Sequence, residues 1–264
     1  MEFILTLIPA VAALIFYRLY TIRRRDFNVI SVTPTTKLSK ANGYVEIAGK
    51  QHAWNQNPLI SHLKKVKCTW YKYEVEVERI SHNSKGHTKR EWKTVESGQS
   101  DAPIVFGDGS GYCLIDTKEA EIVSTIKKQW YGDYESDDRM PKGLIGNIAK
   151  FTSMTFGRSR YRFTELLMMP ESYLYAIGEM SIAQSGNPIV QDWVHKYPDL
   201  RHIVKGETVK VLSGKGLPLD KPFIISGKSE QELLKQKKLS ANGYLLLAIG
   251  CACLTLYLIN IFFI

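Results

Sequence analysis

The chain has 264 residues and a formal net charge of +9, with 44% hydrophobic and 11% aromatic residues. This composition supports a folded core and excludes a largely disordered chain. The four cysteines form no Cys-x-x-Cys pair, so we expect neither a zinc module nor another metal site. Cys68 and Cys113 are predicted to stay reduced.

The first 25 residues are predicted to be an N-terminal transmembrane anchor. An apolar stretch extends from Phe3 to Tyr17, and Arg23, Arg24 and Arg25 follow it. A cleaved signal peptide would carry its positive charge before the apolar stretch. The reversed order therefore favours an anchor that is retained.

Residues 241–264 are predicted to be a C-terminal transmembrane helix. They contain no charged side chain, and as a helix they would be about 36 Å long, enough to cross a hydrocarbon core of about 30 Å. Basic residues flank the two spans on the side of the central domain: Arg23, Arg24, Arg25, Lys235, Lys237 and Lys238. The positive-inside rule then places the central domain in the cytoplasm and both termini outside. These clusters make the lipid bilayer the predicted partner rather than nucleic acid.

Residues 30–228 are predicted to form a mainly β (α+β) domain with barrel-like closure. Many short alternating segments separated by turns are typical of such a domain. The expected strands are 44–49, 68–78, 92–95, 102–106, 112–116, 121–123, 162–168, 173–180, 208–212 and 223–225. Ser229 and Glu232 have the spacing of a capping box, which predicts a juxtamembrane helix over 229–240 that leads into the second span.

The segment 142–158 does not have the pattern of a strand. Leu144, Ile145, Ile148 and Phe151 fall near helical spacing, with basic residues around them. Two interpretations stay open: an amphipathic helix lying on the bilayer, or a surface helix or long loop packed on the domain.

Several segments together resemble the GIDE domain, also called the "beside a membrane" domain, between about residues 30 and 235. The matching stretches are Cys68-Thr-Trp-Tyr-Lys-Tyr-Glu-Val-Glu, Trp92-Lys-Thr-Val-Glu-Ser-Gly98, Asp101-Ala-Pro-Ile-Val-Phe, Asp108-Gly-Ser-Gly-Tyr-Cys-Leu-Ile-Asp116, Glu119-Ala-Glu121, Arg160-Tyr-Arg-Phe-Thr-Glu-Leu-Leu167, Tyr173-Leu-Tyr-Ala-Ile-Gly-Glu179 and Lys221-Pro-Phe-Ile-Ile-Ser-Gly-Lys-Ser-Glu230. The motif positions expected to be structural are Trp70, Tyr71, Tyr73, Trp92, Glu96, Ser97, Asp101, Pro103, Asp108, Gly109, Gly111, Asp116 and Glu165.

The resemblance implies a prokaryotic relative of mitochondrial membrane-anchored ubiquitin ligases, placed in a bacterial inner membrane. The ligases carry a zinc-binding RING module after the second span, and this sequence shows no such module, so ligase activity is not expected to transfer. Mitochondrial relatives place the domain between two membranes, which implies the alternative that the central domain lies on the outer side. Prokaryotic relatives often occur with helical membrane proteins of the LemA family, which implies a partner of that type.

Two groups of motif residues have alternative interpretations. Asp108-Gly-Ser-Gly111 has the composition of a calcium or phosphate loop, but a hairpin turn explains it more simply because a strand follows. Glu96, Ser97 and Asp101 would suit a hydrolase, yet no histidine lies in the motif to activate a serine.

From these observations we expect no catalytic residues and no cofactor. The predicted function is a non-enzymatic scaffold, anchored at both ends, that assembles with itself or with another membrane protein. The alternatives are an accessory subunit of a ubiquitin-like ligase and a module that binds lipid at the membrane surface.

Overall fold

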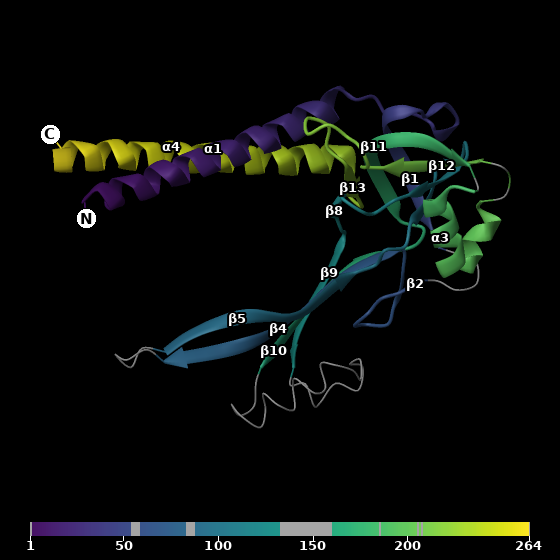
Figure 1. The fold of residues 1–264 in the computed structure, drawn as a ribbon, viewed down its shortest axis with the longest axis horizontal. Coiled ribbons are helices and arrows are strands. Elements are labelled where there is room, and N and C mark those ends of the chain that lie inside the picture. The colour runs from purple at the N-terminus through teal and green to yellow at the C-terminus, as the bar shows by residue number, and fades with distance from the viewer. Residues whose placement is uncertain are drawn as a thin grey trace.

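Two long helices leave one side of a β domain in the computed structural model of the chain (Figure 1), which describes residues 2–53, 59–82, 88–132, 160–184, 186–204, 206 and 208–263. Helix α1 (Glu2–Val32) and helix α4 (Glu230–Phe263) pack against each other, and the two termini lie together at the end far from the β domain. The helices therefore run antiparallel as one hairpin.

Both helices are apolar enough to cross a membrane. The most apolar 18-residue windows within the spans Leu5–Val32 and Glu230–Phe262 have mean hydropathies of 1.7 and 2.3, and only 11% and 6% of those windows are buried. A core helix of a soluble protein would bury most of that surface, so the exposed apolar side chains are compatible with anchoring in lipid.

Helix α4 begins with the capping box that the sequence predicts. The Ser229 backbone N–H donates to Glu232 Oε2 at 3.1 Å, and the Glu232 N–H donates to Ser229 Oγ at 3.3 Å. The helix continues without a break through the predicted juxtamembrane segment into the apolar segment.

Five strands close into a small barrel, which confirms the barrel-like, mainly β fold. Strand β1 closes the ring because it pairs with β11 along one edge and with β6 along the other. The ring is completed by the pairs β6–β7, β7–β12 and β12–β11. The strands are β1 (Gly43–His52), β6 (Ile104–Gly107), β7 (Tyr112–Ile115), β11 (Tyr173–Gln184) and β12 (Thr208–Ser213). Strands β13 (Ile224–Ser226) and β8 (Glu121–Val123) extend the sheet from β11.

The barrel interior holds the largest hydrophobic cluster, which includes Ile47, Phe106 and Leu212. Its outer wall is covered in two places. Helix α3 (Pro188–Lys196) and the 3₁₀ helix η3 (Pro198–His202) cover one side with Trp193 and Leu200. The barrel-proximal parts of α1 and α4 cover another, where Ile30 and Leu233 pack on outward-facing residues of β11. A further 3₁₀ helix, η1 (Leu38–Lys40), follows α1.

A second, four-stranded sheet projects from the barrel toward the side on which the helices lie (Figure 1). We call this sheet the arm, and its strands in spatial order are β5 (Thr88–Gln99), β4 (Trp70–His82), β10 (Tyr161–Met168) and β9 (Ile126–Gly132). The short pair β2 (Leu59–Ile60) and β3 (Lys67–Cys68) lies at its base.

The arm and the barrel share core residues at their join. Trp70 and Met168 pack in the barrel cluster, while Val75 and Phe163 farther along the same two strands form the arm's own cluster. The arm is therefore a continuation of packed structure rather than a tethered hairpin.

All ten expected strands coincide with strands of the structure, with ends that differ by a few residues. Strand β9, the pair β2–β3 and helix α3 were not expected. The predicted segment 142–158 lies outside the described residues.

Candidate functional site

The helix hairpin meets the barrel at a cluster of charges around two buried residues, which we call the junction: Arg23, Arg25, Asp26, Glu121 and Lys237. Asp26 on α1 and Lys237 on α4 are each only 3% exposed, and Lys237 Nζ lies 3.1 Å from Asp26 Oδ2. Lys237 Nζ also donates to Glu121 Oε2 on β8 at 2.7 Å. One ammonium group therefore joins both helices to the barrel sheet.

Arginines from α1 complete the junction. Arg23 Nη1 donates to Glu121 Oε1 at 2.8 Å, and Arg25 Nη2 donates to Asp26 Oδ1 at 3.1 Å. Burial alone would raise the pKa of Glu121, but the hydrogen bond and charge of Lys237 together with those of Arg23 hold it below its ordinary value. Both carboxylates of the junction thus have cationic partners, which buried ions require.

This arrangement divides the six basic residues that flank the spans into two groups. Arg23, Arg25 and Lys237 bind acidic partners within the protein. Arg24, Lys235 and Lys238 are exposed and remain available to the surroundings. Sequence position indicates that all six lie near the membrane, but it does not distinguish the structural cations from the exposed ones.

A second buried carboxyl lies nearby on the barrel wall. Glu46 on β1 is 1% exposed and accepts hydrogen bonds at 2.6 Å from both Tyr175 Oη and Thr35 Oγ1. Burial raises the pKa of Glu46, and the two hydroxyl donors offset part of that rise. It ties the segment after α1 to strands β1 and β11.

The Asp108 motif forms a turn that holds η1. Asp108 Oδ1 accepts from the Ser110 N–H at 2.8 Å, and Asp108 Oδ2 accepts from the Leu38 N–H at 2.7 Å. Burial opposes ionisation, but these donors lower the pKa of Asp108. Gly109 has φ of +82°, as a tight turn requires, whereas Gly111 has no positive φ. The carboxylate therefore binds backbone and hydroxyl donors within the fold.

Glu165 has a comparable role at the base of the arm. It is fully buried, and its carboxylate accepts from the backbone N–H groups of Leu63 and Lys64 at 2.8 and 3.1 Å. The Ser61 hydroxyl donates to it at 3.3 Å. The side chain thus fixes the loop between β2 and β3 on strand β10.

The structure does not bring Glu96, Ser97 and Asp101 together as a catalytic set. Glu96 and Ser97 are consecutive strand residues and so face opposite sides of the arm. Asp101 accepts hydrogen bonds from Lys196 Nζ and, at 2.6 Å, from Tyr197 Oη. Burial opposes a fall in the pKa of Asp101, but these two donors lower it. Asp101 thereby fastens the end of α3 beside β6.

A histidine outside the sequence motifs lies beside Glu96. Tyr73 Oη donates to Glu96 Oε1 at 2.8 Å, and His62 Nε2 lies 3.6 Å from the same oxygen. The His62 and Tyr73 rings stack with centroids 4.2 Å apart. Burial lowers the pKa of His62, and the Glu96 charge opposes that change. No signal in the sequence links residue 62 to residue 96, because the contact depends on how the β2–β3 loop folds over the arm.

The remaining motif residues are distributed over the barrel and the arm. Trp70 is buried in the barrel core, Tyr71 lies near Tyr73, and Pro103 is buried just before β6. Trp92 lies on the arm, where the Arg162 guanidinium is 4.7 Å from its ring centroid. Asp116 Oδ1 accepts from the Lys118 N–H at 3.0 Å, and burial raises the pKa of Asp116.

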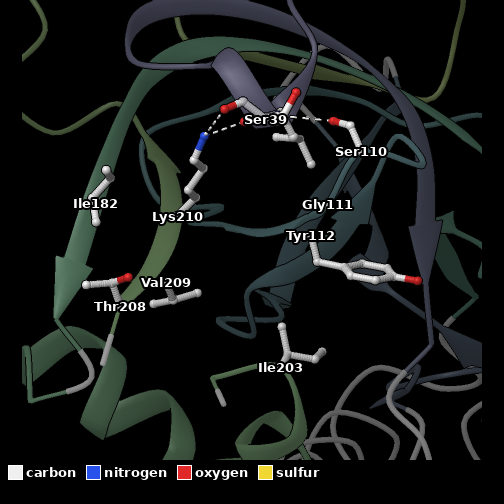
Figure 2. A pocket seen from close by; sticks show the side chains of 10 residues that line it. Ser39, Ser110, Gly111, Tyr112, Ile182, Ile203, Thr208, Val209 and Lys210 are labelled. Atoms are coloured by element: carbon white, nitrogen blue, oxygen red, sulfur yellow. Dashed lines mark hydrogen bonds between the residues drawn. The ribbon is translucent and has the colours of Figure 1, made fainter. Parts of the chain in front are cut away.

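A cavity of about 270 Å³ opens between strands β7 and β12 of the barrel (Figure 2). Tyr112 and Gly111 line it from the β7 side, and Thr208, Val209 and Lys210 line it from β12. Among the described residues, no group of three or more His, Cys, Asp or Glu side chains is placed to hold a metal ion. The lining is instead a mixture of hydroxyl, aliphatic and aromatic groups with one ammonium.

Fold and hydropathy together define a β-barrel module on a pair of antiparallel helices that are apolar enough to cross a membrane. Residues 74–196 match the family model of the GIDE domain, which is described as an E3 ubiquitin ligase. The match agrees with the family named by the resemblance in the sequence motifs, over slightly less than half of the chain. No curated protein and no solved structure matches the chain.

Proposed function

We propose that this protein is a non-enzymatic, membrane-anchored adaptor that assembles with itself or with another membrane protein. Both ends are anchored, and the β domain presents its barrel and arm beside the bilayer. A helical membrane protein of the LemA type is one candidate partner, by the resemblance described above.

The junction is the observation that carries this proposal. The buried Lys237 on α4 contacts the buried Asp26 on α1 and the partly exposed Glu121 side chain on β8. Buried ion pairs are weak contributors to stability but hold their partners in one fixed arrangement. A domain that served only as a mobile appendage would not need its two membrane helices fixed to its sheet.

The direction of the arm supports a partner in the same membrane. Figure 1 shows the arm leaving the barrel on the side where the helices lie. When the hairpin spans a bilayer, the arm therefore faces the bilayer surface, where the exposed part of a neighbouring membrane protein would be within reach.

The polar motif residues support a role without catalysis. The carboxylates of Asp101, Asp108 and Glu165 accept hydrogen bonds that hold loops and helices of the fold. Ser97 is exposed on an arm strand and faces away from Glu96. The contacts of these motif residues are therefore explained by their role in holding the fold together.

The proposed location is a bacterial inner membrane, with the β domain in the cytoplasm and both termini outside. The exposed basic residues Arg24, Lys235 and Lys238 on the domain side of the spans support this orientation. A reporter fused after Ile264 tests it: an external signal agrees with this orientation, and an internal signal reverses it.

The test of the adaptor is the composition of the purified protein. The full chain is extracted in mild detergent from its own membrane, and its mass is measured by light scattering and native mass spectrometry. We expect two or more copies, or a second membrane protein in fixed stoichiometry. A chain that is recovered alone and as a monomer overturns the proposal.

A matched pair of variants makes the test specific to the junction. Lys237→Met removes the shared ammonium, whereas Lys238→Met removes an exposed neighbouring charge. We expect the complex to be weakened by the first variant and preserved by the second. If the complex is equally stable in Lys237→Met and Lys238→Met, the junction has no role in assembly.

The description of the matched family favours one second candidate, an accessory subunit of a ubiquitin-like ligase. It predicts that the purified chain accelerates transfer by a ligase that already has a RING module. The assay adds the full chain to such a reaction and measures the rate of conjugate formation. An unchanged rate at saturating chain would exclude this candidate.

A further inference from the structure

The barrel is incompletely closed between β7 and β12. These parallel strands pair only at Val211 with Leu114 and at Leu212 with Ile115. By contrast, β12 pairs with β11 over its whole length from Thr208 to Ser213. Figure 2 shows Thr208, Val209 and Lys210 on one side of an opening and Gly111 and Tyr112 on the other, and the cavity lies between them. We call this opening the gap.

The register identifies which backbone groups face the gap. The Asp116 N–H donates to the Leu212 carbonyl at 2.9 Å, so Leu212 turns its backbone polar groups toward β7. Alternate residues of a strand turn these groups to the same side. Thr208 on β12 and Tyr112 on β7 therefore present their N–H and C=O groups to the gap.

Within the described part of the chain, no strand pairs with Thr208 or Tyr112 on that side. Unpaired strand edges act as templates for another extended chain. The gap thus offers donors and acceptors in the spacing of a peptide backbone.

The charges around the gap are already bound. Lys210 Nζ donates to the carbonyls of Leu38, Ser39 and Ala41, which uses all three of its protons. Ser110 Oγ accepts from the Ser39 N–H at 3.0 Å. With its one cation satisfied, the lining as described by the structure has no free charge for a phosphate or a nucleotide, and its charge complementarity favours an uncharged occupant.

Exposed apolar side chains flank the gap on both sides. Ile182 on β11 is 61% exposed, and Tyr112 on β7 is 62% exposed. In strand addition, backbone hydrogen bonds supply affinity and pockets for alternate side chains supply specificity. The gap supplies backbone groups, and the cavity with Ile182 and Tyr112 supplies apolar surface for ligand side chains.

We propose that the gap binds a short, extended, uncharged segment of a partner polypeptide, which adds as a strand along the free edge of β12. The stretch of β12 from Thr208 to Lys210, before the residues paired with β7, is about 10 Å long, so about three ligand residues fit along it. This inference rests on the proposed adaptor function, because it names the surface at which such a partner is held.

The test begins with a probe of defined composition. A phage library of random decapeptides is selected on the full chain in lipid nanodiscs, after removal of phage that bind empty nanodiscs. The enriched sequences are expected to be uncharged and rich in β-branched residues. Their affinities are then measured by fluorescence anisotropy with synthetic peptides.

Two matched variants locate the binding site. Ile182→Arg places a charge at the gap, and Ile80→Arg places the same charge on an arm isoleucine that is 53% exposed. We expect the first to weaken peptide binding by about tenfold or more and the second to leave it within about twofold. Because both positions are exposed, neither variant is expected to unfold the chain.

Methylation of the peptide backbone tests the mode of binding on the wild-type chain. Single N-methyl groups are introduced at each central peptide position in turn. Strand addition along β12 predicts the largest losses, of about tenfold, at alternate positions, since only alternate amides face β12 and the β7 side offers the single residue Tyr112. Sensitivity without a period of two would overturn strand addition.

The remaining outcomes separate this inference from the adaptor function. Absence of enriched peptides, or equal binding by Ile182→Arg and Ile80→Arg, overturns the assignment of the gap. Light scattering on the same preparation reports assembly independently. An intact complex that binds no peptide would support the adaptor function and overturn peptide binding at the gap. A monomer that binds peptide would support peptide binding at the gap and overturn the adaptor function.

Discussion

Removing the ammonium of Lys237 tests whether the junction holds the helices to the barrel. Lys237→Met leaves Asp26 buried at 3% exposure without its closest counter-ion from α4. Breaking a buried pair by removing one partner costs about 3–5 kcal/mol. Arg25 remains 3.1 Å from Asp26, and Glu121 keeps Arg23 and a side chain that is 41% exposed. The free energy of unfolding should therefore fall by about 3 kcal/mol, at the lower end of that range.

The assay is thermal unfolding of the full chain in detergent, followed by tryptophan fluorescence. For a chain of this size, each kcal/mol lowers the Tm by about 2–4 °C, so Lys237→Met should lower it by about 6–12 °C. Lys238→Met is the control and should change the Tm by less than about 2 °C. The double variant Asp26→Leu/Lys237→Met should recover much of the loss, because no uncompensated charge is then buried. Equal Tm values for Lys237→Met and Lys238→Met would refute the reasoning.

Three further predictions concern the barrel and the arm. Gly49→Ala should destabilise the chain by about 2 kcal/mol or more, because the added Cβ would lie 2.4 Å from the Gly107 carbonyl oxygen. Gly111→Ala meets no atom within 4 Å and should be neutral in the same denaturant titration. Glu165→Gln replaces an acceptor of two loop N–H groups and should cost about 1–3 kcal/mol in that assay, and a cost no greater than that of Gly111→Ala would contradict its role. The folded-state pKa of Glu46 is raised, so its protonated form stabilises the fold at low pH and this contribution is lost as pH rises through the folded pKa. Unfolding titrations from mildly acidic to neutral pH should therefore show the wild type losing stability relative to Glu46→Gln as pH rises, and parallel curves would contradict the shift.

Sequence pattern located most strands because alternation of polar and apolar residues is a local property. Strand 121–123 is found with its predicted bounds. Strand β9 lacks this signal, since Lys127, Lys128 and Gln129 are all exposed and only Trp130 turns toward the arm's core. As an edge strand it is defined by its pairing with β10, which no local pattern encodes.

The division into barrel and arm could not be predicted for a related reason. The alternation in β4 identifies a strand but not the sheet to which it belongs. Trp70 belongs to the barrel core and Val75 to the arm core, although both lie on the same strand. Helix α3 is different, because its N-terminal signal is present: Asn187 Oδ1 accepts from the Ile189 N–H, with Pro188 at the first turn.

The charge cluster at the junction could not be predicted from the sequence, which identifies its basic residues only as neighbours of the two apolar spans. The flanking basic residues lie on the parts of α1 and α4 nearest the barrel. The burial of each residue depends on the register between α1 and α4 and on the position of β8. The pairing of Lys237 with Glu121 therefore could not be predicted without the three-dimensional structure. Asp26 gave one local signal, as an acidic residue that directly follows three arginines.

The folded unit extends beyond the residues that match the family model. The match covers 74–196, which includes β6, β7 and β11 but neither β1 nor β12. Strand β1 pairs with β11 from Gly43 to Lys50 and closes the ring against β6, while β12 supplies the remaining wall. Without them the inner face of β11 would be exposed to water.

We therefore expect two fragments of the chain to differ in whether they fold. Residues 33–229, which contain every strand of the barrel and the arm, should unfold cooperatively in denaturant. Residues 74–196 alone should show no cooperative transition, because five-strand closure is impossible and the barrel core loses Ile47 and Leu212. A cooperative transition in the shorter fragment would show that the matched residues form a unit of their own, for which barrel closure is not required.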